Sequence, residues 1–227
     1  MQLSEISISN LMYDLPIFPL NTVLFPGMPL KLHIFEDRYK LMISRCYQNG
    51  EPFGVALIKS GQEIGGRAEP FLVGCTAIIT EMEPLPGERM NIVAVGRERF
   101  VARNFKYDQP YLVAEVETLS LSHTESVTLN NASRSLRPWV QRYLQTLADA
   151  SETKFDIQQL PEDPLQLAYL ASFLLNIPIE QKQNLLNIEN ADEFIRDLRV
   201  IYRREVTLLN AMLAPETAED AGVFSAN

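Results

Sequence analysis

The sequence predicts an α+β fold in which a β-rich lobe precedes a bundle of helices. Up to about residue 120, short apolar runs rich in Val, Ile, Thr and Phe alternate with Gly and Pro, a pattern typical of strands joined by tight turns. Beyond residue 120, apolar residues recur at steps of three, four and seven, which is the spacing of amphipathic helices. The chain has 227 residues, 46% of them hydrophobic, so it can bury a core without disulfide or metal staples.

The first half contains about seven predicted strands, which suggests a small barrel or sandwich. The strands cover residues 15–20, 28–35, 53–59, 71–82, 90–95, 100–107 and 111–121. The Pro-Gly pair within 83–89 predicts a hairpin turn, and the polar link 96–99 predicts a second turn. One helix interrupts the strands: Asp37 is its expected N-cap, and Asn49-Gly50 ends it.

Four helices are predicted in the second half. They cover 135–147 and then start at Pro164, at Pro178 and, for the longest one, at Asn190. Asp163 directly before Pro164 is the pattern of an N-cap followed by Pro, and Asn190 with Glu193 has the spacing of a capping box. The patterns divide the chain into an N-terminal extension (1–14), a barrel lobe (15–122), a helical lobe (123–213) and a disordered acidic tail (214–227).

Composition and charge weigh against several classes of protein. Lys and Arg total 20 against 29 Asp and Glu, and a net charge of −9 argues against nucleic acid and anionic membranes as partners. Residues 1–10 lack the basic and apolar regions of a secretory signal, and the most apolar stretch, 165–177, is too short to span a bilayer. Isolated thiols at Cys46 and Cys75 fit a reducing compartment, so we expect a cytoplasmic protein.

The sequence contains no recognisable motif for a cofactor, a metal or a catalytic centre. The glycines of 61–66 are not followed by the Lys-Ser/Thr pair of a P-loop, and no dinucleotide-binding glycine pattern is present. Two cysteines and two histidines are too few and too dispersed for a zinc site. His33 lies in an alternating strand and His123 in the link between the lobes, without a Gly-x-Ser-x-Gly elbow. We therefore expect no enzymatic activity, no cofactor and no metal.

The remaining chemistry is recognition through apolar side chains. The segment 24–30 (LFPGMPL) has the composition of a loop, yet it carries large apolar residues. Some of these are expected to pack inward, and any that stay exposed would form an apolar patch suited to unfolded or extended polypeptide. The candidate peptide-binding residues are Leu24, Phe25, Met28 and Phe35.

Three blocks near the N-terminus form a specific set: 15–20 (LPIFPL), 24–30 (LFPGMPL) and 33–39 (HIFEDRY). Together they closely resemble the opening of the Lon protease N-terminal, substrate-binding domain. The resemblance continues through 53–55, 73–78, 95–100 and, more loosely, 179–186, so that it covers roughly residues 15–213. Asp37 departs from the Pro that this family commonly has before Arg38-Tyr39, and both residue types suit a helix start.

The resemblance implies a PUA-like pseudo-barrel followed by a helical bundle that ends in a long helix. Full-length Lon proteases add an ATPase module and a Ser–Lys peptidase, whereas this chain has no P-loop and ends soon after the long helix. We expect a stand-alone, non-catalytic module that binds exposed or unfolded polypeptide segments and assists proteolysis or protein quality control. A separate protease is a candidate partner.

Two other functions stay open. The long C-terminal helix could offer an apolar face to one specific folded partner, in which case the chain would be an adaptor or a scaffold. A PUA-like barrel also allows RNA binding by analogy of fold, but the net charge of −9 argues against it. These patterns leave the oligomeric state undetermined.

Overall fold

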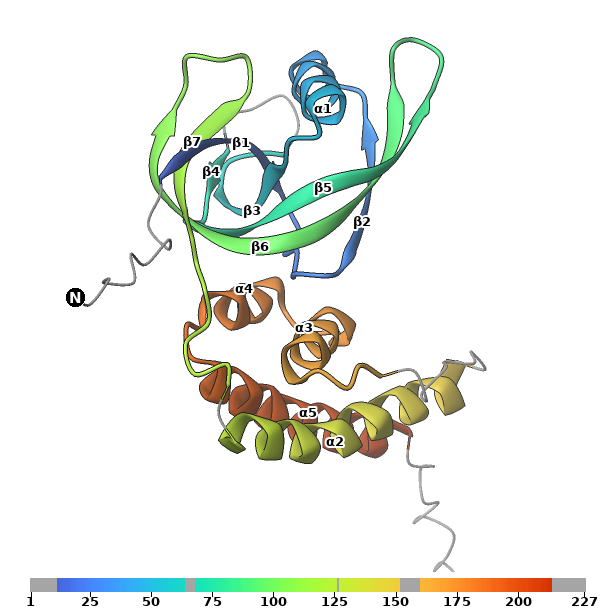
Figure 1. Cartoon of the computed structure of the whole chain (residues 1–227). Coiled ribbons are helices and arrows are strands. Elements are labelled where there is room, and N and C mark those ends of the chain that lie inside the picture. The colour runs from blue at the N-terminus through green and yellow to red at the C-terminus, as the bar shows by residue number, and fades with distance from the viewer. Residues whose placement is uncertain (1–11, 64–67, 126, 152–159, 214–227) are drawn as a thin grey trace, which may run out of the picture.

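The computed structural model describes residues 12–63, 68–125, 127–151 and 160–213, which form a β-rich lobe stacked on a helical lobe (Figure 1). The first lobe contains β1 (Tyr13–Leu20), β2 (Pro29–Ile34), α1 (Asp37–Asn49), β3 (Phe53–Ser60), β4 (Glu69–Pro70), β5 (Val73–Pro84), β6 (Met90–Lys106) and β7 (Leu112–Thr118). The second contains α2 (Val127–Ser151), α3 (Pro164–Leu174), α4 (Ile179–Asn187) and α5 (Ala191–Leu213). The predicted α+β class is confirmed, and the predicted tail 214–227 lies outside the described residues.

Five strands close the β-rich lobe into a barrel. β1 pairs antiparallel with β7 and parallel with β3, while β7, β6, β5 and β3 follow one another through antiparallel pairs, so the ring returns to β1. The short strands β2 and β4 lie outside the ring, β2 on β6 and β4 on β3. In Figure 1, β2 runs along the outer side of this lobe, below α1.

Apolar side chains fill both sides of the barrel wall. One cluster joins residues of β1, β6 and β7 around Phe100, and another packs strand residues against α1. In the second cluster the rings of Phe18 and Tyr39 stack with their centroids 3.9 Å apart. Ile34 of β2 belongs to this cluster, so one face of β2 is anchored under α1.

The predicted turn at 96–99 is wrong, because β6 runs through it without interruption. Gly96 allows this by its lack of a side chain: a Cβ there would lie 2.4 Å from the main-chain oxygen of Phe25, far inside van der Waals contact. Gly96 N also donates to Met28 O at 3.0 Å. The pairing with β5 is irregular at this point: Cys75 lies opposite Arg99 and Ala77 opposite Gly96, so β6 carries one extra residue between these pairs.

Two predicted N-caps are confirmed in the second lobe, whereas the predicted N-cap of α1 is wrong. The predicted start at 135 is also wrong, because α2 begins at Val127 and ends at Ser151. The Asp163 carboxylate accepts from the main-chain N–H groups of Leu165 and Gln166 at 3.0 and 2.8 Å, and Asn190 Oδ1 accepts from Glu193 N at 3.1 Å. In α1 the N-cap is Glu36, without a side-chain capping bond. Asp37 is instead the first helical residue, and its carboxylate lies 2.9 Å from Lys40 Nζ one turn later.

The two lobes meet through apolar packing and a few buried polar contacts. Val23, Phe25 and Leu57 of the β-rich lobe belong to the same apolar cluster as the core of the helices. Arg99 of β6, only 3% exposed, donates through Nη1 to the main-chain oxygens of Leu186, at 2.8 Å, and Ile188. These carbonyls lie at the C-terminal end of α4, where a cation is favourable. Figure 1 shows α4 directly below β6.

None of the described helices is both long enough and apolar enough to pass through a lipid bilayer.

Candidate functional site

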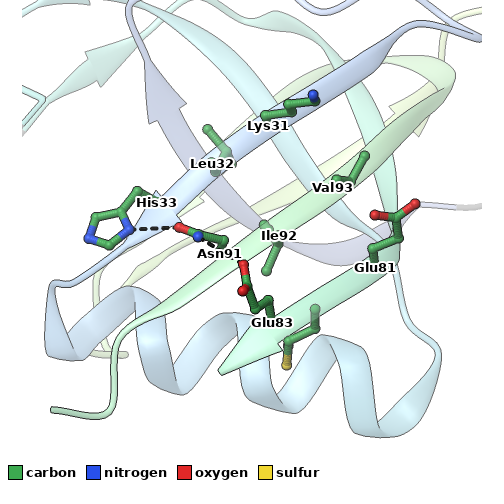
Figure 2. A pocket seen from close by; sticks show the side chains of 9 residues that line it. Lys31, Leu32, His33, Glu81, Glu83, Asn91, Ile92 and Val93 are labelled. Carbon is green, nitrogen blue, oxygen red and sulfur yellow. Dashed lines mark hydrogen bonds between the residues drawn. The ribbon is translucent and has the colours of Figure 1, made fainter. Parts of the chain in front are cut away.

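A groove of about 640 Å³ runs across the outer face of β2, β6 and β5 (Figure 2). The three strands lie side by side in register, which brings side chains distant in the sequence into adjacent rows. The groove is lined by Lys31, Leu32, His33, Glu81, Met82, Glu83, Asn91, Ile92 and Val93. Since its residues come from three strands, no single stretch of the sequence contains it.

The polar row of the groove is held by a chain of hydrogen bonds. His33 faces Asn91 across the β2–β6 pair, and Asn91 faces Glu83 across the β5–β6 pair. Asn91 Nδ2 donates to Glu83 Oε2 at 3.1 Å, which leaves Asn91 Oδ1 as the acceptor for His33 Nδ1 at 2.8 Å. Nδ1 of His33 is therefore assigned as the protonated nitrogen, and Figure 2 shows this row along one side of the groove.

Apolar surface lies between and beside these polar groups. Leu32, Met82 and Val93 are half-buried in the groove. Met82 also lines a neighbouring groove of about 520 Å³ between α1 and the β5–β6 hairpin, where Leu41 is 53% exposed. Phe35, 43% exposed, has its ring centroid 6.0 Å from that of His33 at the end of the first groove. Large exposed apolar side chains beside a polar rim are typical of surfaces that bind other chains.

The structure separates the four predicted peptide-binding residues into two groups. Leu24 and Phe25 are buried, at 4% and 0% exposure, because the segment they belong to folds over Gly96 and into the core. Met28 is half-buried and packs on both neighbouring apolar clusters. Phe35 alone of the four is exposed. A role in peptide binding therefore stays a prediction for Phe35 and Met28, while Leu24 and Phe25 offer no surface in this structure.

Met82, Val93 and Leu41 were not among the predicted site residues. The alternation of β2 gave a signal for His33 and Lys31, which it places together on one outer face. Val93 becomes a neighbour of that face only through the register of β2 on β6, in which it lies opposite Lys31. Met82 lies opposite Ile92, on the other face, and packs against the apolar cluster under α1. The alternation within one strand specifies a face but not the strand beside it.

The groove offers hydrogen bonds and apolar contact, and its histidine is not next to a nucleophile. His33 is bonded to an amide, and both thiols lie elsewhere in buried positions. Burial raises the pKa of Cys46 to about 11 and that of Cys75 to about 12, which keeps both protonated at neutral pH. Within the described ranges, no group of three or more His, Cys, Asp or Glu residues is placed to hold a metal ion.

Comparison with known families decides the relationship. The family model of the ATP-dependent protease La (LON) substrate-binding domain matches residues 14–201, which include all seven strands of the β-rich lobe apart from the first residue of β1 and most of the helical lobe. The chain belongs to the Lon substrate-binding-domain family. The predicted resemblance is thereby confirmed, and the match covers the substrate-binding domain rather than the ATPase or peptidase parts of Lon.

Curated relatives are Lon proteases of which this chain matches one part. The Lon protease of Amoebophilus asiaticus is 28% identical over 173 residues, which cover 74% of this chain and 21% of the relative. That of Flavobacterium johnsoniae is 24% identical over 196 residues, covering 83% of this chain and 24% of the relative. The chain thus spans about a fifth to a quarter of the length of these two relatives.

Solved structures of Lon N-terminal domains share the fold. A Lon N-terminal domain protein from Xanthomonas campestris matches with a TM-score of 0.58 and 21% identity, covering 83% of this chain and 98% of that one. The N-terminal domain of the Mycobacterium avium complex Lon protease matches with a TM-score of 0.66 and 18% identity, covering 84% and 98%. At these identities the likeness concerns the fold alone.

Proposed function

We propose that this chain binds exposed or unfolded segments of other polypeptides without cleaving them, and that it assists proteolysis or quality control carried out by a separate protease. The observation that carries the proposal is the groove on β2, β6 and β5, in which half-buried apolar side chains lie between polar ones. Membership of a family described as a substrate-binding domain supports it. A cytoplasmic location belongs to the same proposal and rests on the sequence pattern.

The surface around the groove suits chains that lack a fixed shape. Phe35, Leu41 and Met82 spread apolar contact along a shallow surface rather than around one deep pocket. A thioether side chain such as that of Met82 adapts to partners of different shape. The rim offers the carboxylates of Glu81 and Glu83 and the ammonium of Lys31, so main-chain and polar side-chain groups of a bound segment find partners there.

The test compares binding of a carboxymethylated, permanently unfolded model protein with binding of its native form, by fluorescence anisotropy and without ATP. We expect the unfolded form to bind more tightly. The double variant Phe35→Ser/Leu41→Ser should weaken binding by about thirtyfold, since each change removes an apolar contact of about 1 kcal/mol. Val200→Ser, which alters a 59% exposed residue on α5, is the matched control and should bind as the parent does.

Two results would contradict the proposal. If the unfolded model protein shows no binding at any accessible concentration, polypeptide recognition is excluded for this surface. If the incubated model protein is cut into fragments by the pure protein, the non-catalytic part of the proposal fails. Equal losses of binding affinity in the groove variant and in Val200→Ser would indicate that the binding site lies outside the groove.

A second candidate function is that of an adaptor for one folded partner. The end of α5 carries large apolar residues in the open: Leu208 is 50% exposed, Met212 80% and Leu213 49%. An exposed apolar helix end of this kind suits docking to a complementary groove. Cross-linking in cell extract tests it: a single partner that is captured by the parent and lost in Leu208→Glu/Met212→Glu would favour the adaptor over a binder of many unfolded clients.

A further inference from the structure

β2 is an edge strand whose outer side is unpaired among the described residues. It pairs with β6 alone and lies outside the closed ring of the barrel. The main-chain groups on its other side are therefore not used by the sheet, and Figure 1 shows β2 along the outside of the lobe. An unpaired strand edge offers a row of N–H and C=O groups that another extended chain can bind.

The hydrogen bonds at the start of β2 show which of its residues direct their main-chain N–H and C=O groups away from β6. Gly27 N donates to Gly96 O at 2.9 Å, and Gly96 N donates to Met28 O at 3.0 Å. With Gly27 at φ 78°, this is a β-bulge in which two residues face one, and it directs the Met28 carbonyl at β6. The main-chain groups of successive residues in a strand point to alternate sides.

From Met28 onward, every second residue of β2 therefore directs its main chain at β6. These inward residues are Leu30, Leu32 and Ile34, paired with Ala94, Ile92 and Met90. The residues between them, Lys31 and His33, direct their N–H and C=O groups away from the sheet. No described residue forms a hydrogen bond with these outward main-chain groups.

Pro29 provides an independent check of this assignment. Proline has no N–H group, so within a strand it is tolerated where that N–H would point away from the neighbouring strand. Pro29 belongs to the same outward set as Lys31 and His33. The N–H that proline lacks is thus one that the β2–β6 pair does not need.

We propose that this free edge receives the bound polypeptide: an extended segment of a client chain adds to β2 as a further strand and forms main-chain hydrogen bonds with Lys31 and His33. The inference rests on the proposed function and specifies how the segment is recognised. Main-chain pairing is indifferent to the client sequence, which suits a module that must accept many unfolded chains.

Side chains flanking the edge define the kind of segment. Residues of the added strand opposite Lys31 and His33 lie on the groove face, beside the exposed ring of Phe35. Residues between those positions lie beside the half-buried Leu30 and Leu32. We expect segments in which apolar residues alternate with polar or aromatic ones and in which proline is absent. The continuity of the edge with the groove favours a client chain over a second copy as the occupant.

Amide hydrogen exchange measured residue by residue provides the first test, with a seven-residue peptide of alternating Val and Thr that carries a Lys at each end. Without peptide, the amides of Lys31 and His33 should exchange much faster than those of Leu32 and Ile34, which are bonded to β6. Saturating peptide should slow the two outward amides by about tenfold or more and leave Leu32 unchanged. Unchanged exchange at Lys31 and His33 in the saturated complex would overturn the proposal.

A pair of variants at one position separates the main chain from the side chain. His33→Pro removes an outward N–H that the fold does not use, and should weaken peptide binding by about fivefold. His33→Ala removes the same side chain but keeps that N–H, so it should bind at least about threefold more tightly than His33→Pro. Should His33→Pro fail to fold, peptides methylated at one main-chain nitrogen at a time give the same information, because a methylated nitrogen cannot donate a hydrogen bond. In an added strand only every second peptide residue directs its N–H at β2. Methylation at those positions should abolish binding, and methylation at the positions between them should not.

The outcomes distinguish this inference from the proposed function. If the unfolded model protein binds and both methylated sets bind equally, polypeptide recognition stands and the added strand is wrong. If neither the model protein nor the peptide binds, the proposed function fails first. If the outward amides are already protected without peptide and the protein is a dimer in solution, a second copy occupies the edge and the client proposal is overturned.

Discussion

At the scale of single residues, the two thiols illustrate how burial changes chemistry. Cys46 lies on the buried face of α1 and Cys75 lies in β5, both at 1% exposure or less. Removal from water disfavours the thiolate, which raises both pKa values from 9.0 to about 11 and about 12. The sequence indicated isolated thiols, and the structure adds that both are buried and contribute to packing.

We predict that neither thiol reacts with an aromatic disulfide reagent at pH 8 in the folded protein, and that both react once urea unfolds it. In the folded protein the raised pKa keeps the thiols protonated, whereas in the unfolded chain they ionise as the pH passes the ordinary value of 9.0. This ionisation stabilises the unfolded state relative to the folded state. The free energy of unfolding should therefore fall as the pH rises from 9 toward 11. Urea titrations across this range measure it, and the Cys46→Ala/Cys75→Ala variant should show a smaller decrease. Fast reaction at pH 8 in the native state would contradict the burial.

At the scale of secondary-structure elements, local signals predicted helix starts well when a side chain could reach the main chain. Asp163 and Asn190 act as expected because capping is settled within three residues. Asp37 was assigned one position off, since Glu36 and Asp37 are adjacent acids at the same helix start and composition does not distinguish them. The predicted turn at 96–99 failed because Gly96 and Arg99 pair with β5 and Gly96 also bonds to the segment before β2, and the local polar composition does not reveal these contacts.

Asp163→Ala should lower the free energy of unfolding by about 1 kcal/mol, since two main-chain N–H groups at the start of α3 lose their acceptor. Urea unfolding followed by circular dichroism measures the change. Glu162→Ala is the matched control: it removes the neighbouring carboxylate, whose side chain is 99% exposed, and should change stability by less than about 0.5 kcal/mol. Similar losses in both variants would indicate that negative charge near the helix, and not the cap, is responsible.

The residues of the groove could be predicted only in part from the individual secondary-structure elements. Lys31 and His33 alternate with apolar residues along β2 and lie exposed on its outer face, and Phe35 is exposed as well. The partners of these residues on β5 and β6 depend on the pairing register, which local sequence leaves open for residues as far apart as His33 and Asn91, 58 positions along the chain. The hydrogen bonds from His33 through Asn91 to Glu83 could therefore not be predicted from the sequence.

At the scale of the whole molecule, the two lobes share one apolar cluster. Phe25, from the segment between β1 and β2, lies fully buried in the cluster that also contains the helical core. Arg99 and Gln183 add hydrogen bonds across the junction, the latter from its Nε2 to Val73 O at 3.0 Å. Shared burial of this kind couples the stability of the two parts, because neither lobe can unfold without exposing the other's surface.

We predict that the described lobes unfold in one transition and that Phe25→Ala lowers the free energy of unfolding by about 3–5 kcal/mol, the range for removing a buried phenylalanine. Trp139, the single tryptophan, lies in α2 and reports on the helical lobe. Its fluorescence should shift to a lower urea midpoint together with the circular dichroism signal. Phe35→Ala, at an exposed phenylalanine, is the control and should leave both midpoints nearly unchanged. An unaltered Trp139 transition in Phe25→Ala would mean that the lobes are independent.

The sequence by itself determined the α+β class, the order of strands before helices and the family, because these depend on periodicity, capping and short motifs that act locally. The tertiary structure decided which apolar residues are exposed: it buries Leu24 in the cluster under α1 and Phe25 at the junction of the lobes. It leaves Phe35 exposed beside His33. It also decided that β2 stays outside the closed ring with one side unpaired among the described residues. Both outcomes depend on contacts between segments far apart in the chain. Such contacts form only where the side chains of the whole core pack closely together, which local sequence does not specify.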